Sequence, residues 1–275
     1  VLGVGNQRVL VRDHTGAVMP LHQVRQALPY QVADLLPVPV NETILDFYPI
    51  AEVEGSSPPE MTGLLVAAIK ESIETNVATL EDAGLKVKAV DLSPFALVRA
   101  LTAAGQLDGC KTAVFIGDRT TFIVVVNEGV PQFVRIVPAG GDTITEAAVD
   151  ATGMTLEEAE ALKLQIGIDQ GADPEYAAPA DAMLRALRSI VGSVRSTNSY
   201  YLSNFGGIPI SEVVVLGRET RVPGLVRAVG EHVGLPTIAG APLAGLSVSG
   251  DTSAETLNEL EPELAIALGL ALGSR

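Results

Sequence analysis

The alternation of apolar and polar residues over the first part of the chain predicts a compact α+β unit. Residues 7–12 alternate with the period of a strand, whereas the apolar side chains of residues 21–35 recur at helical spacing. Gly84 follows a second helical stretch and supplies a natural C-terminal cap. The predicted order is strand, helix, strand, strand, helix and strand, over residues 7–12, 21–35, 43–50, 62–69, 70–83 and 86–92.

The pattern then changes to longer apolar strands and helices, which predicts a second unit. A short helix is expected over residues 94–104, and the segment from Gly105 to Gly109 breaks the chain after it. Thr155 and Glu158 have the spacing of a capping box, so a helix should begin there. The remaining predicted elements are strands 112–117, 120–129, 131–141, 212–217 and 236–240, helices 142–152, 181–202, 223–233 and one from 261, and a loop at 170–179.

Composition and charge limit what such a protein can bind. The chain has 275 residues, of which 47% are hydrophobic and 19% charged, so it can bury a core large enough for two domains. A formal net charge of −15 repels phosphate backbones and anionic lipid over most of the surface, which argues against nucleic acid as a partner. Cys110 is the single cysteine and no metal-ligand spacing occurs, so we expect a reducing cytoplasm and no metal site. The longest apolar run, residues 264–272, covers about half of a bilayer, so we expect no membrane insertion.

Segments along nearly the whole chain resemble, in order, those of one family. They are "LPYQVADLLPVPVNETILDFYPI", "LLVAAIKESI", "EDAGLKVKAVDLSPFALVRAL", "FVRIVPAGGDTIT", "EEAEALKLQIG" and "ELAIALGLALG". On these segments the chain resembles the PilM family of actin-like type IV pilus assembly proteins. That family is similar to the division protein FtsA, within the superfamily of actin, sugar kinases and heat-shock chaperones.

The resemblance implies an α/β, actin-like (ribonuclease H-like) fold with two lobes and an inserted α+β module in the first lobe. Residues 1–112 would belong to the first lobe, with the module at about residues 8–91. Residues 113–275 would form the second lobe, with a helical subdomain at about 150–205 and a C-terminal helix, 261–273, that packs back on the first lobe. The chain opens in a stretch with the character of a buried strand, so we expect the first lobe to be N-terminally incomplete.

The role implied by the resemblance is that of a cytoplasmic scaffold, peripheral to the inner membrane through a partner. Such a protein binds the N-terminal cytoplasmic tail of a PilN-like membrane protein in a groove between the module and the core of the first lobe, and acts with other pilus assembly proteins. Tyr30 and Leu36, near the apolar run 35–40, are the candidate contacts, because an extended peptide gains affinity from apolar pockets. The alternative is that this region, and Phe47 above all, forms the module's own core.

The same resemblance implies a nucleotide site in the second lobe. In the wider fold a hairpin with the pattern Asp-x-Gly-x-x-Thr-Thr grips phosphates, and residues 115–121 match it at Gly117, Thr120 and Thr121. Phe115 stands where the pattern has its carboxylate, and a benzyl side chain can hold neither a metal-bound water nor an attacking one. Losing one hydrogen bond to a charged group costs about 1.5–3 kcal/mol.

The adenosine side of this site is matched only in part. Relatives have a glycine-rich turn after a strand, whereas only Gly217 is retained here, and Arg218 and Glu219 would crowd the base. Glu160 and Lys163 match the Ala-Glu-x-x-Lys signature that contacts ribose or adenine in relatives. The alternative for this pair is a surface ion pair, which contributes little to stability.

The departures from the pattern argue against ATP hydrolysis. Gly140 and Gly141 match the family's double glycine, although a tight turn needs glycine in any case. Asp118, inside the hairpin turn, would aim a repelling charge at the phosphates. We therefore expect no catalytic residue and no cofactor in this chain, while ATP with Mg²⁺ stays open as a ligand of the full-length protein. The remaining alternatives are an actin-like ATPase and an FtsA-like division or type II secretion platform adaptor.

Overall fold

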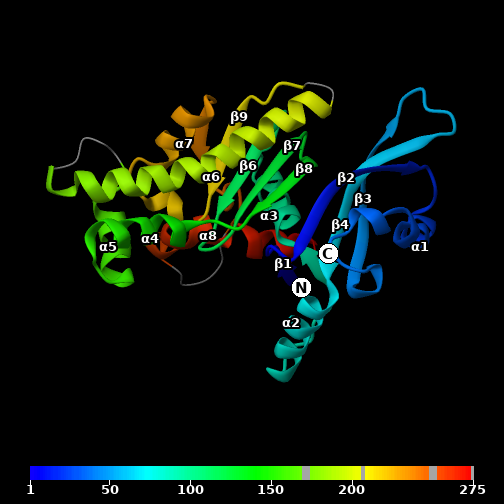
Figure 1. Ribbon diagram of the computed structural model, residues 1–275, viewed down its shortest axis with the longest axis horizontal. Helices are drawn as coiled ribbons and strands as arrows, with labels where there is room; N and C mark the ends of the chain where they lie inside the picture. Colours follow the sequence, from blue (N-terminus) through cyan, green and yellow to red (C-terminus); the bar gives the residue numbers. More distant parts are fainter. Residues whose placement is uncertain (169–173, 206–207, 248–252, 274–275) are drawn as a thin grey trace.

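The structure, a computed structural model, describes residues 1–168, 174–205, 208–247 and 253–273. A large α/β unit is built around a five-stranded sheet and a smaller unit around a three-stranded sheet, and a third sheet has two short strands (Figure 1). The arrangement is the mixed α/β architecture that the sequence predicts. None of the helices in these described ranges is long and apolar enough to cross a membrane.

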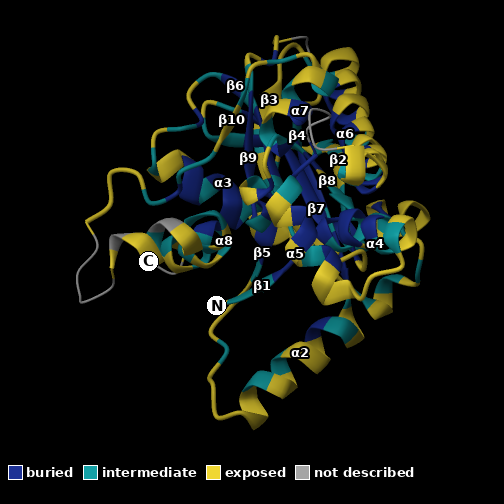
Figure 2. Ribbon diagram, turned by 90° about the vertical axis from the view of Figure 1, so that its left-hand side faces the viewer, coloured by how far each residue is buried: buried dark blue, intermediate teal, exposed yellow. Residues whose placement is uncertain are grey.

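The large unit is centred on a sheet with the strand order β10-β9-β6-β7-β8. Its central strands are dark in Figure 2 because helices cover both faces, and strands that are buried on both faces must be apolar along their whole length. One face packs on α4, α5, α6 and α7, and the other on α3 and α8. The strands are β6 (Cys110–Ile116), β7 (Thr121–Asn127), β8 (Val130–Val137), β9 (Glu212–Leu216) and β10 (Thr237–Ala239).

The helices around this sheet follow the apolar periodicity of the sequence. α5 begins at the predicted capping box, where the hydroxyl of Thr155 accepts from the N–H of Glu158 and the Glu158 carboxylate accepts from the N–H of Thr155. Gly153 ends α4 in the left-handed conformation. The helices are α3 (Ser93–Ala103), α4 (Gly141–Thr152), α5 (Leu156–Ile166), α6 (Ala177–Asn204), α7 (Leu225–Val233) and α8 (Ala254–Gly273).

The smaller unit, called the module below, is a three-stranded antiparallel sheet, in the order β2-β4-β3, with α1 on one face. Leu28 of α1 and Leu65 of β4 are fully buried in its core together with Phe47, so the alternative stated for Phe47 is confirmed. β2 and β3 are the two edge strands of this sheet. The elements are β2 (Val9–Ala17), α1 (Leu21–Gln31), β3 (Thr43–Val53), β4 (Glu60–Ile69) and α2 (Lys70–Asp82).

The last helix of the chain lies beside residues near its beginning. β1 (Leu2–Val4) pairs in parallel with β5 (Val90–Leu92), and α8 packs against both β1 and α3. The contact between α8 and α3 is close, since a Cβ on Gly269 would come 1.7 Å from the carbonyl oxygen of Ala96. Glycine at position 269 therefore allows two helix backbones to touch.

Some boundaries differ from the predictions for physical reasons. The strand predicted over 86–92 is confined to Val90–Leu92, because only these residues pair with another strand. The helix predicted from residue 261 starts at Ala254 and contains Pro262, whose carbonyl accepts a hydrogen bond from the N–H of Gly217. Part of the loop predicted over 170–179 lies outside the described residues.

Candidate functional site

The predicted phosphate hairpin lies directly over the N-terminus of α4. The N–H of Gly117 donates to the carbonyl of Thr120 at 3.0 Å and closes the turn between β6 and β7. The N–H groups of Gly141 and Asp142 then donate to the carbonyls of Gly117 and Asp118, both at 2.8 Å. Free amides at a helix N-terminus form a ready anion site. Here these two amides are bonded to the hairpin itself.

Close packing, rather than turn geometry alone, explains the double glycine. A Cβ on Gly140 would lie 2.1 Å from the carbonyl oxygen of Gly117, and a Cβ on Gly141 would lie 2.2 Å from Oε1 of Glu219. Both positions exclude a larger residue because the hairpin and the Glu219 carboxylate press against the start of α4.

The hairpin side chains face a cavity of about 650 Å³. Phe115 and Phe122 stack with ring centroids 5.9 Å apart, and both line this cavity together with Thr120. The hydroxyl of Thr121 is buried and donates to the carbonyl of Ala139 at 2.8 Å. At the position of the motif's carboxylate the cavity therefore has an aromatic wall.

Lys163 is completely buried at the centre of a polar network, so the interpretation of the Glu160–Lys163 pair as a surface ion pair is wrong. Its ammonium lies 2.8 Å from Oε2 of Glu160 and donates to Oε1 of Glu219 at 3.0 Å and to the hydroxyl of Thr145 at 2.9 Å. The Thr145 hydroxyl in turn donates to Glu160 at 2.6 Å. The three donors of the ammonium each have a partner, which is what a buried cation requires.

The two glutamates of the network differ in their proton affinity. Burial alone would raise the pKa of Glu160, but hydrogen bonds from Lys163 and Thr145 hold it below the ordinary value of a glutamate. Burial raises the pKa of Glu219, against the opposing positive charge of Lys163. The network therefore holds one well-stabilised carboxylate and one whose negative charge is disfavoured by desolvation.

Arg218 connects this network to the hairpin. Its Nη2 lies 3.3 Å from Oε1 of Glu160 and 3.4 Å from Oδ1 of Asp118. Asp118 thus has an arginine beside it and also lines the cavity at the hairpin, and the expectation that its charge is directed at a phosphate stays a prediction. Gly217 has φ +100° and a Cβ there would come 2.1 Å from the carbonyl oxygen of Ile116, so only glycine fits before Arg218.

The structure brings together, at one end of the five-stranded sheet, the residues predicted from the sequence, which are Glu160, Lys163, Gly140, Gly141, Gly217 and those of the hairpin. Thr145 and Glu219 were not predicted from the sequence as partners of Lys163. No spacing in the sequence links α4, α5 and the turn after β9, so only the fold could reveal these contacts.

A second cavity, of about 280 Å³, separates the module from β1 and β5. Module residues on one side, among them Ile44 and Val66, face Val4, Leu92 and Phe95 on the other. The carboxylates of Asp46 and Asp91, which also line it, are bonded to Arg25 and Arg99. The remaining surface of this groove is apolar.

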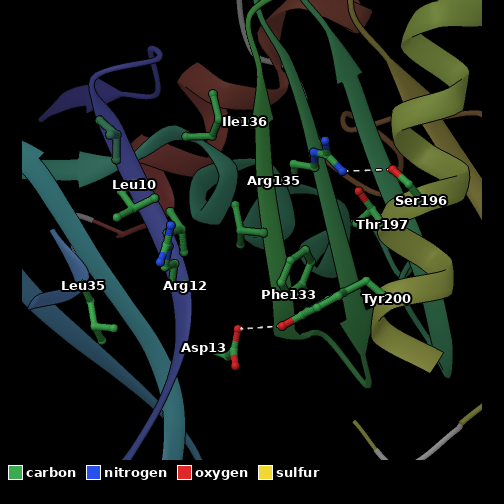
Figure 3. A pocket seen from close by; sticks show the side chains of 13 residues that line it. Leu10, Arg12, Asp13, Leu35, Phe133, Arg135, Ile136, Ser196, Thr197 and Tyr200 are labelled. Carbon is green, nitrogen blue, oxygen red and sulfur yellow. Dashed lines mark hydrogen bonds between the residues drawn. The ribbon is translucent and has the colours of Figure 1, made fainter. Parts of the chain in front are cut away.

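A third cavity, of about 730 Å³, lies between β2 of the three-stranded sheet and β8 of the five-stranded sheet (Figure 3). Tyr30, on α1, is 89% exposed, whereas Leu36 packs against the module's core. Neither residue lines this cavity or the groove beside β1 and β5.

Comparison with known proteins identifies the family of this chain and a solved structure that is similar to it. The family described as "Type IV pilus assembly protein PilM" matches residues 22–275. The chain belongs to the PilM family. The solved structure described as "PilM-PilN type IV pilus biogenesis complex" superposes with a TM-score of 0.81 at 25% identity and covers 97% of this chain and 76% of that one.

More distant structures share the actin-like fold. The ethanolamine utilization protein EutJ from Carboxydothermus hydrogenoformans matches with a TM-score of 0.52 at 19% identity, over 92% of this chain and 72% of that one. MreB 5 of Spiroplasma citri, solved with AMPPNP, matches with a TM-score of 0.51 at 12% identity, over 74% of this chain and 63% of that one. The predicted α/β actin-like fold is confirmed.

Cell division protein FtsA is related in sequence. The Bacillus subtilis protein is 24% identical over 61% of this chain and 42% of its own length, and the Streptococcus pneumoniae protein is 30% identical over 39% and 24%. The PilM-family chain therefore spans less than half the length of these curated relatives.

Proposed function

We propose that this PilM-family chain acts as a scaffold of the type IV pilus inner-membrane platform, cytoplasmic and held at the membrane by a PilN-like protein. The likeness to a solved PilM–PilN complex supports a partner of that kind. The observation that carries the proposal is the apolar groove between the module and β1 and β5. It lies between the module and the core of the first lobe, where the family resemblance expects a peptide tail.

The groove suits an extended, apolar peptide. β5 is an edge strand of the β1-β5 sheet, so its outer backbone groups are open to pairing with an added strand. Asp46 and Asp91 are already bonded to arginines, which leaves Ile44, Val66 and Phe95 as the main contact surface. The tail would gain affinity from apolar side chains rather than from charge.

The tail-binding proposal is tested with a synthetic N-terminal tail of the PilN-like partner. Ile44 is 43% exposed, so Ile44→Asp should fold and weaken binding by about tenfold or more in fluorescence anisotropy, because a charge then faces an apolar peptide. Leu156→Asp, at a 58% exposed position on α5, is the matched control. Unchanged binding by Ile44→Asp would contradict the proposal that the tail binds in this groove.

The same assay decides the contacts predicted from sequence. A tail contact at Tyr30 is the alternative to the groove, and it predicts that Tyr30→Asp abolishes capture of the tail; Tyr30 is exposed enough for the change to leave the fold intact. Leu36→Asp is a poorer variant, since Leu36 packs on the module's core and a charge there would destabilise it. If Tyr30→Asp loses tail binding and Ile44→Asp keeps it, the tail binds at α1 rather than in the groove.

We also propose that the cleft is degenerate and hydrolyses no ATP. The amides of Gly141 and Asp142 are bonded to the hairpin, and Lys163 is enclosed by Glu160, Glu219 and Thr145. These groups would have to leave their present partners before they could bind a nucleotide. Nucleotide binding by the full-length protein is the second candidate function, favoured by the cavity of about 650 Å³ beside the hairpin.

A further inference from the structure

The cavity between β2 and β8 lies where two separate sheets turn edge strands toward each other. β2 is an edge of the module sheet and β8 is an edge of the second-lobe sheet (Figure 3). In the described part of the chain no backbone hydrogen bond joins the two strands. Each strand therefore presents backbone groups that its own sheet does not use.

The register of each sheet shows which groups these are. The N–H of Ile69 donates to the carbonyl of Arg8, so alternate residues after Arg8 face β4, and the backbone of Val11 faces away from it. The N–H of Glu128 donates to the carbonyl of Gly109, so alternate residues of β7 bond to β6 and the residues between them bond to β8. Ile136 of β8 pairs with Phe122, a residue of β7 that bonds to β6, so the backbone groups of Ile136 point away from β7. These outward-facing groups have no backbone partner in the described part of the chain.

The rim of this groove is positive, in contrast to the protein as a whole. Arg12 and Arg135 are exposed on its two sides, and among the described residues neither has a carboxylate partner. The carboxylate of Asp13, which also lines the groove, accepts from the hydroxyl of Tyr200 at 3.4 Å. Val11 and Phe133 are apolar residues that also line the groove.

The complementary surface is found on the same chain, at the far end of the β3–β4 hairpin. Glu52, Val53 and Glu54 are all exposed, and none of the three has an ion pair among the described residues. Residues 43–69 contain no lysine, arginine or histidine. β3 ends at Val53, and Glu54 lies in the turn that follows it. The two glutamates bring negative charge to the end of the hairpin, opposite in sign to the arginines at the rim of the groove.

We propose that the β2–β8 groove receives the acidic end of the β3–β4 hairpin from a second copy of this chain. A hairpin cannot fill the groove of its own chain, because β4 is paired with β2 as far as Ala17 and Glu60. Groove and hairpin are different surfaces, so the contact is heterologous and repeats from copy to copy. Charge complementarity within an acidic protein makes the contact specific and sensitive to salt.

The proposal is tested by sedimentation of the full-length protein at about 50 mM and about 500 mM salt. Association that rises with concentration is expected at low salt and should weaken at high salt. One variant, Arg12→Glu with Arg135→Glu, reverses the charge of the groove, and another, Glu52→Lys with Glu54→Lys, reverses the charge of the hairpin. Each should raise the dissociation constant for self-association about tenfold or more. An equimolar mixture of the two variants should associate again, because each then meets an opposite charge.

The control carries the same change in net charge as the groove variant, at another part of the surface. Lys86→Glu with Lys88→Glu alters two exposed residues before β5 and should leave association unchanged. Absence of association in the unaltered protein, equal loss in the control, or failure of the mixture to recover would each overturn the proposal. Recovery in the mixture also shows that both variants are folded.

Discussion

The ammonium of Lys163 lies 3.0 Å from Oε1 of Glu219, and the two side chains are 0% and 1% exposed. Lys163→Met should therefore lower the free energy of unfolding by about 3–5 kcal/mol, since it leaves the Glu219 carboxylate buried without its cation. Urea unfolding measures the loss. Lys70→Met, which breaks an exposed pair with Glu74, is the control and should cost about 1 kcal/mol or less. A similar cost for both variants would contradict a buried network.

The capping box of α5 predicts a pH dependence. Hydrogen bonds from the backbone N–H and the hydroxyl of Thr155 hold the pKa of Glu158 below its ordinary value. A pKa that is lower in the folded state adds stability above the unfolded pKa, and this is lost as the pH falls through the folded pKa. The difference in urea midpoint between the unaltered protein and Glu158→Gln should shrink at acid pH. In a Thr155→Ala background the difference should be smaller but still present, because the backbone N–H of residue 155 still donates to Glu158.

Replacing Gly217 by alanine should destabilise the fold more than the same change at Gly153, another glycine with positive φ. Gly217→Ala places a Cβ 2.1 Å from the carbonyl oxygen of Ile116, whereas Gly153, at φ +73°, has no atom within 4 Å of such a Cβ. Gly153→Ala should cost about 1–2 kcal/mol from backbone strain alone. Gly217→Ala should cost more in the same thermal or urea unfolding assay, and equal costs would refute the close approach.

Calorimetric titration of the full-length protein with ATP and Mg²⁺ should detect no binding in the micromolar range. The amides at the start of α4 and the ammonium of Lys163 already have partners, and Phe115 offers no carboxylate to a metal. Arg218→Gly is the informative variant, because it removes the side chain between Asp118 and Glu160. Micromolar affinity in the unaltered protein would refute the degenerate cleft.

The local sequence was enough to predict much of the fold. Thr155 and Glu158 specify the start of α5 by contacts within one turn, and the apolar strands from Cys110 to Val137 specify a buried sheet, because both signals depend on neighbours in the chain. The predicted bounds of an element were wrong where pairing with a segment distant in the sequence sets its ends. β5 stops being a strand outside Val90–Leu92 because β1 pairs with those residues alone.

The sequence by itself determined the family, the order of elements and the residues of the degenerate motif, since each of these is written in local pattern and spacing. Only the tertiary structure decided that Lys163 is buried and that Glu219 accepts its hydrogen bond. It also placed β2 beside β8, far apart in sequence, with a groove between them. Burial and charge pairing depend on which distant elements pack together, and residue spacing along one element does not contain that information.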